Sequence, residues 1–66
     1  MGFDHLAEIA RELSIAPGQA RSTVELLQEG ATVPFIARYR KERTGSLDET
    51  QIRQVEERWR YFGELE

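Results

Sequence analysis

The spacing of the apolar residues narrows the possible folds of this chain more than any other feature. Apolar side chains recur three or four positions apart in most of the sequence, as they do along one face of an α-helix. No segment alternates apolar and polar residues for long enough to predict a β-strand. The sequence therefore predicts an all-α fold, and its turn residues divide the chain into four helices.

Two helices are expected in the first half of the chain. Residues 4–13 form the first helix, with Asp4 as its N-cap. Pro17 suits the first turn of the second helix, and Gly30 suits the left-handed position just after its end. The apolar stripe of this second helix consists of Ala20, Val24 and Leu27.

The third helix is expected to run from Pro34 to Gly45, because Pro34 disfavours helical geometry at the residue before it. Its inner side is expected to carry Phe35, Ile36 and Tyr39. A short turn joins it to the second helix, in the manner of a helix-turn-helix. The predicted architecture is a small four-helix bundle in which the second and third helices form this helix-turn-helix-like pair.

A fourth helix is expected from Ser46 to Glu66. Ser46 and Glu49 have the spacing of a capping box, in which each side chain bonds the backbone N–H of the other residue. No stop signal ends this helix, which predicts that residues 1–66 are one helical module of a longer protein. Its apolar seam is a candidate surface for docking other domains of the same protein, and it consists of Ile52, Val55, Trp59 and Phe62.

The composition excludes several classes of protein. A chain of 66 residues forms at most one small domain, and its core supplies only ~3–5 kcal/mol of net stability. It has no cysteine, so we expect no disulfide and no thiolate metal site, and a reducing, cytoplasmic setting is compatible. The longest apolar run has three residues, which excludes a membrane span in this sequence. We expect no cofactor and no small-molecule substrate.

A basic cluster directly follows the apolar residues of the third helix. Four of the nine Lys and Arg residues lie within six positions, although the chain has a net charge of −3. Such side chains can neutralise phosphates, and a neighbouring tyrosine can stack on a base. The candidate nucleic-acid-binding residues are Arg38, Tyr39, Arg40, Lys41 and Arg43.

A structural role for the same cluster is equally concrete. On one continuous helix, Arg38 and Lys41 would share one face, and Arg40 and Arg43 would share another. Two faces do not lie flat on one phosphate backbone, so one pair is expected to be structural. The chain has twelve carboxylates with which arginine can form bidentate pairs, within this module or with other domains.

The sequence LLQEGATVPFIARYRKERTGSLDE, at residues 26–49, resembles the N-terminal region of the Tex family of bacterial transcription accessory proteins. The segments IARELSI and QARSTVELL extend the resemblance over nearly the whole chain. It implies a multidomain parent with a catalytically degenerate RNase H-like domain, helix-hairpin-helix elements and a C-terminal OB-fold of RNA-binding type. That OB-fold is the family's best-supported nucleic-acid-binding element, and it lies outside this sequence.

These observations predict a non-catalytic module of a protein that binds RNA or DNA in transcription or RNA handling. Asp4 and His5 are the one pair that suggests acid–base chemistry, but no nucleophile, second histidine or metal cluster accompanies them. The resemblance places no catalytic residue in this chain. Three roles stay open for the module: direct contact with nucleic acid, purely structural docking of other domains, and pairing as a free-standing dimeric DNA-binding module.

Overall fold

The computed structural model describes residues 5–65, and within that range the chain contains five helices and no strand. This confirms the predicted all-helical fold. The predicted N-cap Asp4 and the predicted last residue of the chain's final helix, Glu66, lie outside the described residues. The helices are α1 (His5–Leu13), α2 (Pro17–Gln28), α3 (Val33–Tyr39), α4 (Lys41–Thr44) and α5 (Glu49–Leu65).

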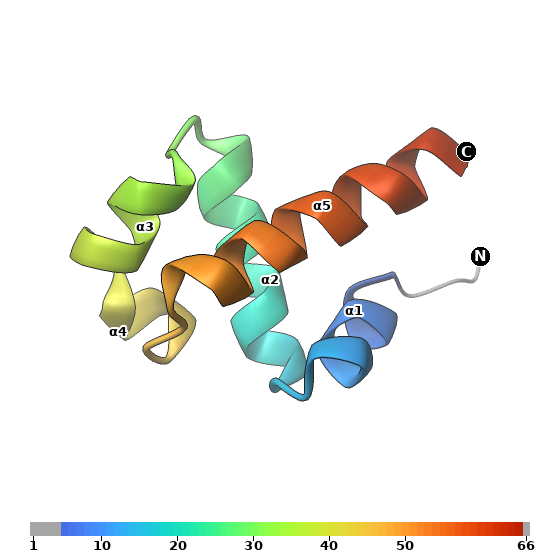
Figure 1. The fold of residues 1–66 in the computed structure, drawn as a ribbon, viewed down its shortest axis with the longest axis horizontal. Helices are drawn as coiled ribbons and strands as arrows, with labels where there is room; N and C mark the ends of the chain where they lie inside the picture. The colour runs from blue at the N-terminus through green and yellow to red at the C-terminus, as the bar shows by residue number, and fades with distance from the viewer. Residues whose placement is uncertain (1–4, 66) are drawn as a thin grey trace.

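Helices α2 and α5 cross at the centre of the fold (Figure 1). α1 packs against both of them at one end, and α3 and α4 lie at the other end. Among the described residues, α1 contacts neither α3 nor α4. The structure thus has five helices where four were expected, and it does not confirm the more specific four-helix bundle with a helix-turn-helix-like pair.

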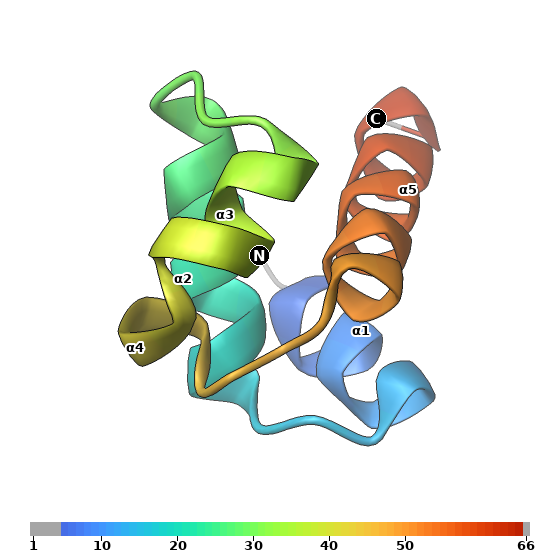
Figure 2. The same cartoon turned by 60° about the vertical axis from the view of Figure 1, so that its left-hand side comes forward.

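The expected third helix is two helices that meet at Arg40. The backbone of Arg40 has φ −127° and ψ 35°, which lies outside the helical region, so α3 ends there. The single turn of α4 then leaves in a new direction (Figure 2). Neither proline nor glycine marks this break, so the sequence offers no local signal for it.

The predicted end of α2 at Gly30 is confirmed. Gly30 has φ +103°, and its N–H donates to the Leu27 carbonyl at 3.1 Å. The Ala31 N–H donates to the Leu26 carbonyl at 3.1 Å, which completes a Schellman motif. This closure satisfies carbonyls at the end of α2 and turns the chain towards α3.

The start of α5 differs from the prediction. Its capping box joins Asp48 and Gln51: the Gln51 N–H donates to Asp48 Oδ1 at 2.8 Å, and the Asp48 N–H donates to Gln51 Oε1 at 3.0 Å. The predicted box between Ser46 and Glu49 is wrong, because Ser46 has φ +69° and belongs to the left-handed turn that closes α4. Both pairs have the same spacing, so the sequence pattern alone did not separate them.

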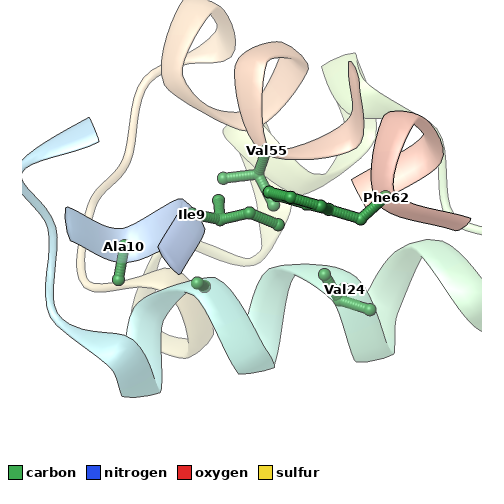
Figure 3. Close-up of a cluster of buried hydrophobic side chains, with 6 residues drawn as sticks. Ile9, Ala10, Val24, Val55 and Phe62 are labelled. Atoms are coloured by element: carbon green, nitrogen blue, oxygen red, sulfur yellow. The ribbon is translucent and has the colours of Figure 1, made fainter. Parts of the chain in front are cut away.

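The core consists of two clusters that share α2 and α5. The first lies between α1, α2 and α5 (Figure 3), and the second lies between α2, α3, α5 and the loop before α5. Each fully buried aliphatic side chain contributes about 1.5–3 kcal/mol. The first cluster contains Ile9, Ala10, Ala20, Val24, Val55 and Phe62, and the second contains Leu26, Val33, Ile36, Leu47 and Ile52.

Candidate nucleic-acid interface

The inner face of α3 is set by Val33 and Ile36, which are three positions apart and both buried. This orientation turns Phe35 and Tyr39 outwards, where their exposed fractions are 39% and 57%. The prediction that both aromatic residues lie on the inner side is therefore wrong, and Ile36 alone of the three is in the core. An exposed aromatic pair is a feature that the sequence pattern did not anticipate.

Phe35 and Tyr39 lie one helical turn apart and contact each other, with ring centroids 5.2 Å apart and planes tilted by 46°. The Arg40 guanidinium lies 4.9 Å from the centroid of the Phe35 ring, within cation–π distance. Its Nη1 also donates to the Tyr39 carbonyl at 3.0 Å. These contacts hold Arg40 beside the aromatic pair.

Arg38 and Lys41 are exposed, and neither forms an ion pair within the described part of the chain. They line a shallow cavity of about 230 Å³ together with Pro34, Ala37 and Glu49. The Glu49 carboxylate lies 2.9 Å from Arg53 Nη2, so it already has a cationic partner. We call Phe35, Arg38, Tyr39, Arg40 and Lys41 the α3–α4 surface.

Arg43 points to a different neighbour. Its Nη2 lies 3.8 Å from Glu25 Oε1 on α2, and both side chains are about half exposed. Such an exposed pair contributes ~0–1 kcal/mol. The structure thus places Tyr39 beside Arg40, places Arg38 and Lys41 at one shallow cavity, and places Arg43 in a contact between helices.

Gln19 is a residue that the sequence reasoning missed. Its Oε1 accepts from the Ala16 N–H at 2.8 Å, and its Nε2 donates to the carbonyls of Thr44 and Gly45 at 2.9 and 3.3 Å. One side chain therefore caps the start of α2 and holds the end of α4. Because its partners lie 25 and 26 positions away, no local pattern predicts this contact.

The second predicted site, the seam of α5, lies mostly inside the domain. Ile52 and Val55 have no exposed surface, and Phe62 is 8% exposed, because all three pack in the two core clusters. Trp59 is half-buried and lines an open cavity of about 440 Å³. A docking role for this seam stays a prediction, and Trp59 is its member with surface left for a partner.

The described residues offer little for other chemistry. The His5 ring stacks on Phe62 with centroids 4.6 Å apart. Within residues 5–65, no group of three or more His, Asp or Glu side chains lies where it could hold a metal ion. In the same range, no helix is both long and apolar enough to cross a membrane.

Comparisons with known proteins identify relatives over nearly the whole chain. A model of the Tex-like protein N-terminal domain matches residues 3–66. The chain is 59% identical over 58 residues to Transcriptional accessory protein Tex of Neisseria gonorrhoeae, which corresponds to 88% of this chain and 8% of that protein. Protein tex of Bordetella pertussis is 53% identical over 66 residues, or 96% of this chain and 8% of the relative.

A more distant relative is S1 RNA-binding domain-containing protein 1 of Homo sapiens. It is 32% identical over 57 residues, which corresponds to 86% of this chain and 6% of that protein. The chain thus spans less than a tenth of the length of these curated relatives.

Proposed function

Because the chain belongs to the Tex-like protein N-terminal domain family, we propose that it is the non-catalytic N-terminal module of a cytoplasmic transcription accessory protein. We further propose that its α3–α4 surface contacts nucleic acid in the parent protein. The names of the relatives support the setting: one is called a transcriptional accessory protein, and a distant one is called an S1 RNA-binding domain-containing protein.

The observation that carries this proposal is that two exposed cations without an ion-pair partner among the described residues and two exposed aromatic rings occur in the same short segment, residues 35–41. Arg38 and Lys41 have no carboxylate partner in the described chain, so intramolecular pairing does not account for them. Tyr39 presents more than half of its surface to solvent. Cations that neutralise phosphates and rings that stack on bases are the two components of a surface that binds single-stranded nucleic acid.

The shape of α3 favours unpaired bases over a duplex. With seven residues, α3 is only about 10 Å long. Because it ends at Arg40, it has few side chains along its length that could reach bases in a major groove. Stacking on Tyr39 and Phe35 requires bases that are free of a partner strand. A helix-turn-helix role for α2 and α3 is the competing arrangement, and it predicts a preference for duplex DNA.

Fluorescence anisotropy of the 66-residue chain with labelled single-stranded RNA and duplex DNA tests the proposal. The double variant Arg38→Ala/Lys41→Ala removes two cations from the surface. The matched control Arg21→Ala/Arg60→Ala removes one exposed arginine from α2 and one from α5, so both variants have the same net charge. We expect the first variant to bind RNA about 10-fold more weakly than the control at low salt.

Salt dependence gives a second readout. The slope of log K against log salt should fall by about 1.4 in the surface variant, because two single-strand phosphate contacts are lost. Equal weakening by both variants would show that only bulk charge matters, and the proposed surface would be rejected. Tighter binding to duplex DNA than to single strands would support the helix-turn-helix arrangement instead.

A further inference from the structure

The cavity beside Trp59 is an apolar site at the junction of the two central helices. It lies between the end of α2 and the C-terminal half of α5 and has a volume of about 440 Å³, within the range of protein binding pockets. We propose that, in the full-length protein, the polypeptide that follows α5 folds back and seats an apolar side chain in this cavity. The cavity is lined by Leu27, Gln28, Glu56, Trp59, Arg60 and Gly63.

The lining has the composition of a small docking site. Leu27 and Trp59 are both half-buried, so each keeps apolar surface available after packing against the core. Glu56 and Arg60 lie at the same site and pair with each other at 3.4 Å, which leaves no net charge to neutralise. An apolar centre with a polar, internally paired rim fits an apolar side chain better than a charged one.

Gly63 is a second, independent observation at the same place. Glycine inside a helix costs about 0.5–1 kcal/mol relative to alanine. Within the part of the chain that the structure describes, a Cβ atom added at Gly63 would meet nothing within 4 Å, so packing among these residues does not require a glycine. A glycine there leaves the backbone of α5 open to close approach from outside, as a segment seated in the cavity would need.

Chain length indicates why the occupant belongs to the same polypeptide. This chain spans 8% of its bacterial relatives and matches an N-terminal domain, so most of such a protein follows α5. A segment on the same polypeptide has an effective concentration in the millimolar range, so a modest apolar contact suffices for docking.

Thiol labelling in the full-length protein tests this inference. Gln28→Cys places a thiol at the cavity, and the matched variant Gln54→Cys places one on the exposed surface of α5 away from it. Mass spectrometry of the peptides follows the reaction of each thiol with a maleimide. We expect Cys labelling at position 28 to be at least about 10-fold slower than at position 54.

Two further measurements identify the occupant. Cleavage at a protease site inserted after Glu66 should restore fast labelling at position 28, because the segment then dissociates. Gly63→Ala, which fits within the domain itself, should accelerate that labelling in the uncleaved protein, while position 54 is unaffected. Trp59→Ala should act in the same direction.

Three results would overturn the inference. Equal labelling of the two thiols in the uncleaved protein would show that the cavity is open. Protection that persists after cleavage and dilution would show that the segment is not the occupant. Protection that rises with protein concentration would assign the cavity to a second copy of the protein.

Discussion

Gly45→Ala tests how the end of α4 is held. Gly45 has φ +68°, in the left-handed region that an alanine adopts only at a cost of about 1–2 kcal/mol. A Cβ atom at this position would also lie 2.6 Å from Gln19 Nε2. Because that atom is the end of a flexible side chain, Gln19 can move aside, but the movement breaks its bonds to the Thr44 and Gly45 carbonyls.

The expected loss therefore has two parts of different origin. The backbone contributes ~1–2 kcal/mol, and the displaced hydrogen bonds of Gln19 contribute ~0.5–1.5 kcal/mol. The combined loss of ~1.5–3.5 kcal/mol is large for a domain whose core supplies only ~3–5 kcal/mol. The variant should be close to half unfolded at moderate urea concentration.

Urea unfolding followed by far-ultraviolet circular dichroism measures this loss, and a double-mutant cycle separates its parts. In the background of Gln19→Ala, the Gln19 amide group and its hydrogen bonds are already absent. Gly45→Ala should then lower the free energy of unfolding only by the backbone part. The expected coupling is about 0.5–1.5 kcal/mol. An equal cost in both backgrounds would refute the role assigned to Gln19, and a cost below ~0.5 kcal/mol in either background would refute the left-handed strain.

Four other substitutions test separate contacts by the same urea measurement. Asp48→Ala should lower the free energy of unfolding by about 1 kcal/mol, because it removes the cap of α5. Ser46→Ala should change that free energy little. The reverse order of the two effects would support the capping box predicted from sequence. Ser46→Gly should stabilise the domain by up to ~1 kcal/mol, because Ser46 has φ +69°, and a destabilised variant would contradict this. Arg58→Ala should lower the free energy of unfolding by about 1 kcal/mol, because it removes a bidentate ion pair with Glu12 at 2.9 and 3.2 Å and a contact with the Tyr61 ring. Part of this loss should disappear at high salt, which screens the ion pair.

Local signals were enough to predict the three longer helices. Pro17 and Gly30 lie at the start and just after the end of α2, where the backbone itself requires them. Thr32 caps α3 by accepting from the Phe35 N–H at 3.3 Å, and the helix begins at Val33, one residue before the predicted start. These signals for the start and end of a helix involve residues that are close in the sequence, so they can be recognised from the sequence alone.

The break at Arg40 and the orientation of α3 depend on distant residues. Gln19 holds the end of α4, and Leu47 and Ile52 pack with Val33 and Ile36 in the second cluster. A short helix with several apolar residues can be turned in more than one way, and these long-range contacts decide which side is buried. The sequence therefore predicted Tyr39 and the basic residues as candidates for this surface, but it placed the Phe35 and Tyr39 rings on the inner side of the helix.

The division of the core into two clusters has a consequence for how the domain opens. Ile15 packs against both clusters, but α1 does not contact α3 or α4 in the described chain. Melting of α3 and α4 would expose the second cluster and leave the first cluster of α1, α2 and α5 in place. We therefore expect amide hydrogen exchange to be faster in α3 and α4 than in α1, in two cooperative units. A ligand on the α3–α4 surface would then slow exchange in that unit alone, and the domain would respond to binding by a local loss of motion with no change in its overall shape.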